Sequence, residues 1–216
     1  MSEFYIVSNV VHRNGMTLYT DHEGKEQSLH ESQGTLDGAC AIYSLIMALK
    51  RRRHINNADV PIYKKLDKRS KKGRLLSELM ERRGLVRQGC YFRELSRLMD
   101  NVYGDEIYTE FISFSKNNEA IEEIKKIITQ EEGSIIIGIE YSSSKAHAML
   151  VVGAEINQER IMKVLCLDPG SPESKVAPWN CYIDTTQRRG KNPFVCFDTN
   201  GIESENCRIS DILIIE

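Results

Sequence analysis

The chain contains six cysteines, and Cys40 stands where a thiol can become a nucleophile. It follows the small residues Gly38 and Ala39 and begins a run, residues 40–49, that is apolar on almost every side. Such a run predicts a buried helix. A thiol in the first turn of a helix lies among unpaired backbone N–H groups at the positive end of the helix dipole, and both stabilise the thiolate that attacks carbonyl groups. We therefore expect Cys40 to be a nucleophile, with an inert core thiol as the simpler alternative.

A thiolate of this kind needs a base and a residue that orients the base, and the sequence offers His147 and Asp168. His147 begins the apolar run 148–153, which predicts a strand, and Asp168 ends the next apolar run, 161–167. If these runs pair as a hairpin about a turn near residues 158–159, both side chains fall at the same end of the sheet. Asp168 can then accept from one ring nitrogen while the other faces Cys40. As alternatives, His147 is an ordinary strand histidine and Asp168 forms an Asp-Pro-Gly turn.

Gln33 is the candidate for stabilising the oxyanion of such a reaction. It lies seven residues before Cys40, far enough for the intervening loop to fold back and present the side-chain amide. Together with the backbone N–H of Cys40 it would form an oxyanion hole, in which one donor contributes about 3 to 4 kcal/mol to catalysis.

The other cysteines have simpler explanations. Cys166 and Cys196 lie in predicted strands and are expected to be core thiols. Cys90 is a rival nucleophile because Gly89-Cys90-Tyr91-Phe92 also precedes a predicted helix, but that helix is amphipathic rather than central, and Gln88 is too close to fold back as an oxyanion donor. No two cysteines have the spacing of zinc ligands, so neither a metal nor another cofactor is expected.

The order of these motifs resembles a known family. A glutamine before the cysteine, the run His147-Ala-x-x-Val-Val-Gly153, and Leu167-Asp-Pro169 follow one another as in the papain-like cysteine peptidases, and the version here is most similar to bacterial double-glycine peptidases that trim bacteriocin leaders. The resemblance covers residues 30–170 as scattered motifs.

The resemblance implies a papain-like α+β fold, in which the helix that carries the nucleophile packs on a twisted antiparallel sheet. It also implies peptide-bond cleavage, often after Gly-Gly, with Cys40 as nucleophile, His147 as general base and acid, Asp168 as its orienter and Gln33 as oxyanion donor. The same triad would equally serve a glutamine deamidase or an acyltransferase.

A freestanding domain of this kind also resembles papain-fold bacterial toxin effectors, which act on proteins of a target cell. That resemblance implies a protein substrate and a cognate immunity or inhibitor protein as partners. The N-terminus lacks the features of a secretory signal and no apolar run is long enough to span a membrane. We therefore expect a cytoplasmic protein, or one exported by a leaderless route, that does not bind membranes.

The elements that must position these residues follow from the apolar patterns. Strands are predicted at residues 4–11, 16–19, 106–114, 134–141, 148–156, 161–167, 194–197 and 209–215, with an Asn14-Gly15 hairpin turn. Helices are predicted at residues 40–49, 75–83, 92–99 and 120–129, the last capped by Asn118. Helices gather in the first half and strands in the second, which favours an α+β fold, and no linker divides residues 1–216, which are expected to form a single domain.

The charges are unevenly distributed. The whole chain of 216 residues has a net charge of −2, which excludes a uniformly basic nucleic-acid-binding protein. Residues 50–97, however, hold 16 Lys and Arg against 5 Asp and Glu. Within them, residues 64–74 are expected to form a solvated basic loop, or a docking surface for an acidic protein or a nucleic-acid-associated target. A module that binds nucleic acid through residues 50–97 is thus a further alternative, and direct binding is disfavoured because few aromatic residues interleave the charges.

Overall fold

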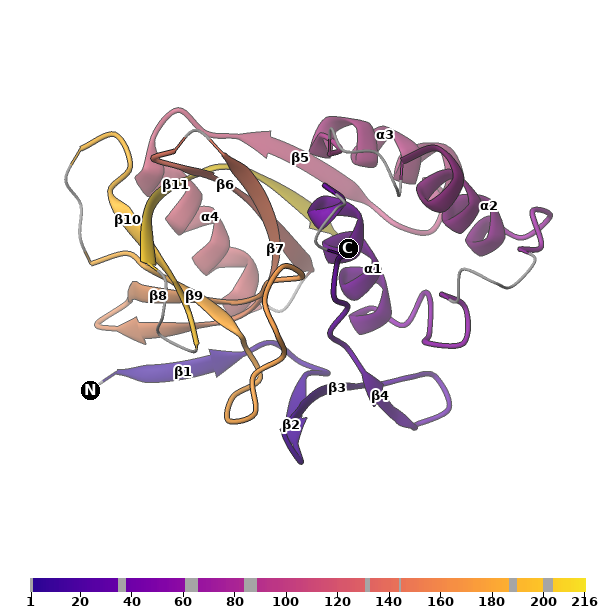
Figure 1. Cartoon of the computed structure of the whole chain (residues 1–216), viewed down its shortest axis with the longest axis horizontal. Helices are drawn as coiled ribbons and strands as arrows, with labels where there is room; N and C mark the ends of the chain where they lie inside the picture. The colour runs from indigo at the N-terminus through magenta and orange to yellow at the C-terminus, as the bar shows by residue number, and fades with distance from the viewer. Residues whose placement is uncertain are drawn as a thin grey trace.

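A computed structural model describes residues 2–34, 38–60, 66–83, 89–130, 133–143, 145–186, 190–199 and 204–216. Its body is sheet-rich, with helices packed on the sheet (Figure 1). The helices are α1 (Cys40–Arg51), α2 (Lys71–Ser77), the π-helical segment η1 (Glu78–Arg83), α3 (Phe92–Tyr103) and α4 (Asn117–Gln130). The strands are β1 (Glu3–Ile6), β2 (Val11–Arg13), β3 (Met16–Thr20), β4 (Glu26–Ser28), β5 (Thr109–Ser113), β6 (Ser134–Tyr141), β7 (Ala146–Asn157), β8 (Arg160–Leu167), β9 (Cys181–Asp184), β10 (Phe194–Asp198) and β11 (Ser204–Ile215).

The large sheet is antiparallel and closes on itself. Strands follow one another as β7, β6, β11, β10, β9 and β8, and β8 pairs back onto β7, so these six strands form a ring (Figure 1). Strand β1 extends along β7 and β5 along β11. The resemblance implied a twisted antiparallel sheet and said nothing of closure. The ring closes because β7 is long enough, at 12 residues, to pair with β6, β1 and β8 at once.

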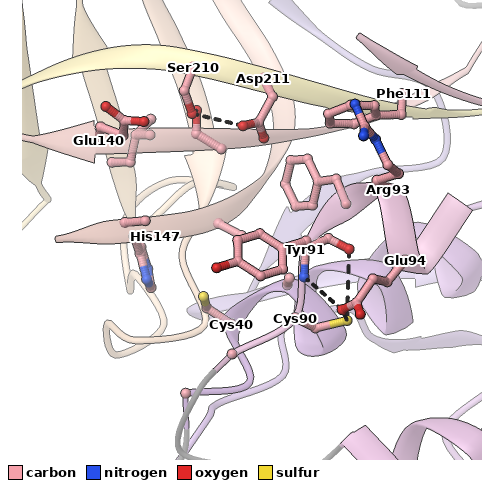
Figure 2. A pocket seen from close by; sticks show the side chains of 18 of the residues that line it. Cys40, Cys90, Tyr91, Arg93, Glu94, Phe111, Glu140, His147, Ser210 and Asp211 are labelled. Carbon is pink, nitrogen blue, oxygen red and sulfur yellow. Dashed lines mark hydrogen bonds between the residues drawn. The ribbon is translucent and has the colours of Figure 1, made fainter. Parts of the chain in front are cut away.

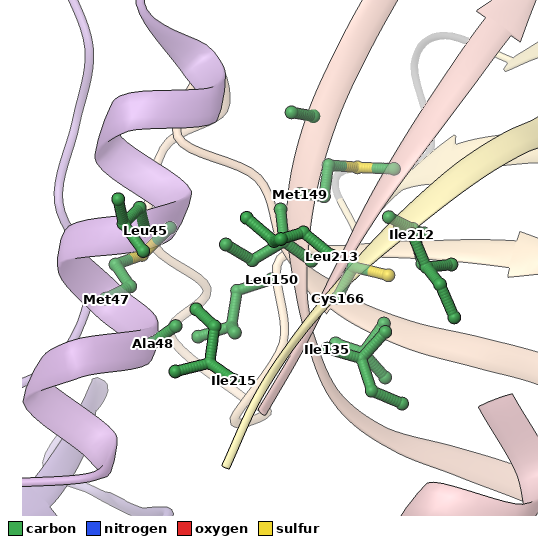
Figure 3. Packing of buried hydrophobic residues seen from close by; sticks show 14 of the residues in the cluster. Leu45, Met47, Ala48, Ile135, Met149, Leu150, Cys166, Ile212, Leu213 and Ile215 are labelled. Atoms are coloured by element: carbon green, nitrogen blue, oxygen red, sulfur yellow. The ribbon is translucent and has the colours of Figure 1, made fainter. Parts of the chain in front are cut away.

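Helix α1 packs on the outer face of the strands that carry the candidate base. Its side chains Leu45 and Ala48 face Leu150 and Leu213, whereas Ile212 points to the other side of the sheet (Figure 3). Leu45, Leu150 and Leu213 are all fully buried, as expected for a helix that is apolar almost all round. The hydroxyl of Ser44 donates to the carbonyl of Ala148 at 3.2 Å and so ties the helix to β7.

The remaining helices complete the layers around the sheet. Strand β5 leads through α4 to β6, and both strands pair with β11, so α4 is the crossover of a βαβ unit. Helix α4 packs on β11 and β7 with Ile121, Ile124 and Ile128, at the spacing of one helix face. Helix α3 packs on β5 and β11 and so lies beside the nucleophile end of α1.

Most predicted elements are present within a few residues of their expected bounds. The Asn14-Gly15 turn joins β2 to β3 with φ angles of 54° and 73°, and residues 158–159 join β7 to β8 with φ angles of 46° and 64°. The single strand expected at residues 4–11 is wrong, because Asn9 adopts a φ of 63° between β1 and β2. Asn118 does not cap a helix, because α4 already begins at Asn117.

The basic loop expected at residues 64–74 is also wrong in part. Residues 64 and 65 lie outside the described residues, but Lys71 already belongs to α2, whose N-cap is Ser70: its side chain accepts from the Gly73 N–H at 3.0 Å. Lys72 pairs with Asp59 at 2.8 Å. Acidic partners therefore neutralise part of this segment.

No helix in the described part of the chain is long and apolar enough to cross a membrane.

Lys50, at the end of α1, is fully buried and pairs with Glu31, so it anchors the segment that leads to Gln33. Burial lowers the pKa of Lys50, and Glu31 opposes this effect. We expect Glu31→Gln to lower the free energy of unfolding by about 3 kcal/mol, because a buried ammonium loses its counter-charge. In this variant the pKa of Lys50 is lower in the folded chain than in the unfolded chain, so the unfolded chain binds more protons. The loss of stability relative to the wild type should therefore shrink as the pH rises from 6 to 9. Denaturant unfolding at both pH values measures it.

The matched control is the double variant Lys50→Met/Glu31→Gln, which removes both charges and keeps the volume. It should regain most of the lost stability. A single variant as stable as the wild type would contradict the anchoring role of this pair.

Candidate functional site

Cys40 is the first residue of α1, at the helix end that faces the sheet. The N-cap, Ala39, offers no side-chain cap, so the first-turn N–H groups of the helix are not satisfied by a capping side chain. The backbone N–H of Ala41 and that of Ala148, on β7, both act on the Cys40 sulfur. The thiol is partly buried between the helix and the sheet.

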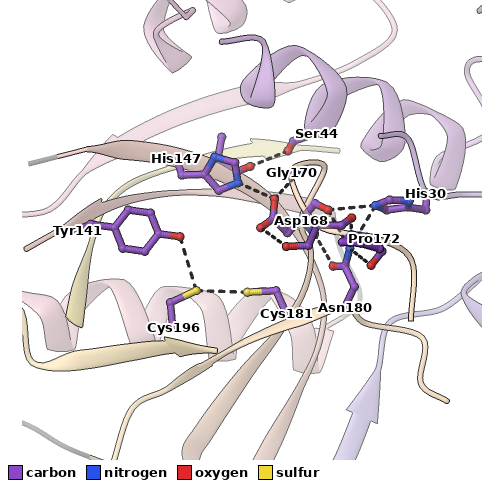
Figure 4. Close-up of polar contacts among 12 residues, drawn as sticks. His30, Ser44, Tyr141, His147, Asp168, Gly170, Pro172, Asn180, Cys181 and Cys196 are labelled. Carbon is purple, nitrogen blue, oxygen red and sulfur yellow. Dashed lines mark hydrogen bonds and ion pairs between the residues drawn. The ribbon is translucent and has the colours of Figure 1, made fainter. Parts of the chain in front are cut away.

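His147 lies on β7 directly beside Cys40, and its ring is fixed by Asp168. The ring Nε2 lies 2.6 Å from Asp168 Oδ1, which leaves Nδ1 for the Cys40 thiol (Figure 4). Both side chains are largely buried, with 16% and 11% of their surface exposed. The structure thus brings together three of the residues predicted from the sequence, and the spatial arrangement matches a nucleophile, a base and an orienting acid.

The Asp168 carboxylate is held by the turn that it begins. Its Oδ1 also accepts from the Gly170 N–H at 2.6 Å, and its Oδ2 accepts from the Ser171 hydroxyl at 3.1 Å. A Cβ at Gly170 would lie 3.1 Å from Asp168 Oδ1 and 3.4 Å from His147 Cε1, so the glycine lets the turn pass close beside the ring.

The backbone of Asp168 is held by Asn180, a fully buried residue just before β9. Asn180 Oδ1 accepts from the Asp168 N–H at 2.7 Å, and its Nδ2 donates to the Asp168 carbonyl at 2.9 Å (Figure 4). Nδ2 also lies near the carbonyls of Ser171 and Pro172. His30 Nε2 reaches the same Asp168 carbonyl at 3.0 Å. Sequence reasoning missed both residues, because His30 lies in a polar stretch and Asn180 in a stretch with no local motif.

Gln33 lies on the same segment as His30 and lines the cavity beside Cys40. Its backbone N–H donates to the Pro169 carbonyl at 2.9 Å, which ties this segment to the Asp168 turn. Its side-chain Oε1 is buried and has no hydrogen-bond partner among the described residues. This unpaired oxygen can only accept a hydrogen bond, whereas an oxyanion donor needs the amide N–H, so the oxyanion role of Gln33 stays a prediction.

The charges of the site depend on one another. Burial raises the pKa of the Cys40 thiol, but the hydrogen bond and charge of His147 reverse this and leave it below its usual value. Burial lowers the pKa of His147, but Asp168 and Cys40 raise it to about 10. Burial raises the pKa of Asp168, yet His147 and the Gly170 N–H bring it below the usual range. The contacts within the site thus favour a thiolate beside an imidazolium over the neutral forms that burial favours.

Comparison with solved structures finds a resemblance in fold. A solved structure of UfSP from C. elegans is similar to 99% of this chain at 15% sequence identity, with a TM-score of 0.45. The chain spans about a third of that protein, 34% of its length. No family model and no curated protein matches the sequence. The chemistry of the site is therefore read from its own geometry.

A cavity of about 740 Å³ lies next to Cys40, between α1, the start of α3 and the sheet (Figure 2). Its lining mixes small, aromatic and charged residues, of which Tyr91, Phe92 and Phe111 are the aromatic ones. The Tyr91 side chain is 79% exposed and overhangs the cavity near Cys40 (Figure 2). A cavity that adjoins the thiol and is open to solvent can admit a substrate segment.

The rival nucleophile Cys90 lines the same cavity but has different neighbours. Its sulfur lies 3.6 Å from the Glu94 carboxylate, which repels a thiolate. The cysteines expected to fill the core, Cys166 and Cys196, are buried, as are Cys181 and Cys207. Among the described residues, no group of three or more His, Cys, Asp or Glu side chains is arranged to hold a metal ion.

The first test concerns the Cys40–His147 pair. In the wild type, iodoacetamide should alkylate Cys40 faster as the pH rises, with an inflection below the pH at which the urea-unfolded chain shows one near 8.5. His147→Ala removes the contacts that lower the pKa and leaves the burial that raises it, so alkylation at pH 7 should slow by about tenfold or more. Peptide mass spectrometry of quenched samples gives the rate for each thiol.

His54→Ala is the matched control, because His54 packs against Tyr103 instead of a thiol. It should leave the Cys40 rate unchanged. Equal rates in wild type and His147→Ala would refute an activated thiol.

The second test concerns Asn180 as a positioning residue. Asn180→Ala leaves the buried N–H and carbonyl of Asp168 without their amide partner, so the ring loses its fixed acceptor. We expect the pKa of Cys40, taken from its alkylation profile, to move up toward the ordinary thiol value, in addition to a stability loss of about 1–3 kcal/mol. Asn101→Ala on the exposed face of α3 is the control. A stability loss without any change in the alkylation profile would show that Asn180 is purely structural.

Proposed function

We propose that this chain is a cysteine peptidase of the papain-like kind, with Cys40 as nucleophile. The observation that carries the proposal is the continuous contact from thiol to imidazole to carboxylate, in which His147 Nε2 lies 2.6 Å from Asp168 Oδ1 and the other nitrogen faces Cys40. A cavity beside the thiol provides room for the substrate.

Acylation begins when the Cys40 thiolate attacks the carbonyl carbon of a peptide bond. The carbonyl electron pair moves to the oxygen, and the oxyanion accepts hydrogen bonds from the Cys40 backbone N–H and the Gln33 amide. His147 Nδ1 then gives its proton to the leaving nitrogen as the C–N bond breaks, which leaves a thioester on Cys40. Asp168 raises the pKa of His147 and so favours the protonated ring that this step requires.

Deacylation reverses the roles. Water attacks the thioester carbonyl and gives a proton to the neutral His147, whose ring Asp168 keeps oriented. The C–S bond then breaks, the acid product leaves, and the thiolate–imidazolium pair is restored. Hydrolysis of a glutamine side-chain amide or transfer of the acyl group to an amine would use the same groups, so deamidation and acyl transfer remain outcomes of the test below.

The narrower expectations remain predictions. Cleavage after Gly-Gly, a toxin role and an immunity partner concern the substrate and the setting rather than the triad. Nucleic-acid binding through residues 50–97 is disfavoured by burial and pairing: Lys50 and Arg51 are buried, and Lys71 pairs with Asp105 and Glu106.

The test compares a cell lysate treated with wild type and with Cys40→Ala. Wild type should generate new peptide N-termini that are absent with Cys40→Ala, because this variant lacks the thiol that His147 activates. Terminal labelling with mass spectrometry detects them, and a gain of about 1 Da on glutamine, without new termini, would instead identify a deamidase.

Cys90→Ala is the matched control, since Cys90 lines the same cavity. It should cleave at the same sites as the wild type. New termini that persist in Cys40→Ala but vanish in Cys90→Ala would overturn the assignment of the nucleophile.

A further inference from the structure

The cavity beside Cys40 ends at a carboxylate, Asp211, that the proposed mechanism does not use. Three neighbouring positions form the floor of the cavity: Ala148 on β7, Gly138 on β6 and Asp211 on β11 are paired across the strands. Cys40 lies at the Ala148 end of this row, where the Ala148 N–H acts on its sulfur. Two strand spacings separate the ends of the row, so Asp211 Cα lies about 10 Å from Ala148 Cα.

A β-bulge in β11 turns Asp211 toward the cavity. Ile209 pairs with Ile139 and Asp211 with Gly138, so Ser210 is an extra residue and the register shifts there. If the ladder instead continued regularly from Ile209, Ser210 would oppose Gly138 and Asp211 would oppose Ile137 on the opposite, apolar face of the sheet. The bulge therefore presents a carboxylate where regular pairing would have buried it among isoleucines.

The small residues in the row leave room for this side chain. A Cβ at Gly138 would overlap Asp211 Oδ1, so the carboxylate leans over the bare glycine. Ala146 and Ala148 also line the cavity, and their short side chains leave space above the sheet near the thiol. A long side chain of a bound substrate can thus lie along the row from Cys40 to Asp211.

Asp211 forms no ion pair with a cation among the described residues; burial raises its pKa, and the charge of Arg208 partly opposes this effect. Ser210 donates to Oδ2 at 3.0 Å, and Oδ1 accepts no hydrogen bond among the described residues. The nearby cations are engaged elsewhere: Arg208 pairs with Glu140 at 2.7 Å, and the Arg93 guanidinium lies 5.5 Å from the centre of the Phe111 ring (Figure 2). A half-buried carboxylate without a counter-charge is costly, and a bound cation offsets that cost.

We propose that this cavity selects a substrate with a lysine or arginine side chain next to the cleaved bond, and that Asp211 is the specificity residue that binds its charged end. The aromatic rings of Tyr91 and Phe92 line the cavity and suit the aliphatic stem of such a side chain. Glycine at the same substrate position would leave most of the 740 Å³ empty and Asp211 unpaired. This inference rests on the proposed function, because it assumes that Cys40 acylates.

The test uses peptidyl acyloxymethyl ketones, which alkylate an activated active-site thiol. Each of two probe pairs consists of one probe with arginine and one with its uncharged isostere citrulline at the same position. In the first pair this position is the residue that bears the ketone, and in the second it is the residue before it. In at least one pair, the arginine probe should label Cys40 about tenfold faster or more, the range for a hydrogen bond to a charged group. Asp211→Asn, which keeps the shape, should bring the ratio close to one.

Glu110→Gln is the matched control, because Glu110 is an exposed carboxylate on the neighbouring β5 outside the cavity. It should keep the wild-type ratio, and thermal unfolding checks that each variant is folded. Equal labelling by arginine and citrulline probes, or a ratio that Asp211→Asn leaves intact, overturns the role of Asp211 while Cys40 still reacts. If no peptidyl probe labels Cys40 although iodoacetamide does, the proposed peptidase function fails instead.

Discussion

The hydrogen bond between His147 and Asp168 is the interaction on which the site depends. Burial alone would drive all three groups toward their neutral forms, since it raises the pKa of Cys40 and of Asp168 and lowers that of His147. Their mutual contacts reverse each of these shifts. The three charged forms therefore depend on one another. The Asp168 carboxylate stabilises the His147 imidazolium, and the imidazolium in turn stabilises the Cys40 thiolate. The amide of Asn180 and the N–H of Gly170 act on this set through the acid, because they fix the place at which the carboxylate meets the ring.

The β7–β8 hairpin explains why residues 21 positions apart meet. Its tight turn at residues 158–159 starts the pairing, and two register shifts along the ladder cancel, so that Leu150 lies opposite Leu167. Beyond that pair, β8 ends and the chain turns at Asp168, while β7 continues back to His147. The Asp168 side chain thus reaches His147 at the end of the β7–β8 ladder. The backbone N–H and carbonyl of Asp168 have no neighbouring strand there and need other partners. Asn180 supplies them with one side chain that both accepts and donates, as a strand would.

Local patterns in the sequence were sufficient for the elements and for three residues of the site. Helix α1, most of the strands and both two-residue turns follow from apolar runs and turn residues, and the hairpin alone predicts that His147 and Asp168 share one end. Contacts distant in sequence were not predictable in this way. Closure of the ring requires β9, a four-residue strand without a distinctive pattern, and the roles of His30 and Asn180 depend on segments 150 residues apart that meet only in the folded chain. The bulge at Ser210 is likewise invisible in a run that reads as one regular strand.

One sheet therefore carries both the candidate chemistry and the candidate selectivity. The row that begins beside the thiol and ends at Asp211 crosses three strands, so the distance between the reacting sulfur and the acidic end is fixed by strand spacing rather than by a loop. The thiolate and the Asp211 carboxylate face the same partly desolvated cavity, where charges interact more strongly than in water. A cationic side chain in this cavity is attracted by both, whereas an acidic one is repelled by both. A cation bound at Asp211 would offset the repulsion between this carboxylate and the thiolate, so substrate selection and activation of the nucleophile would reinforce each other.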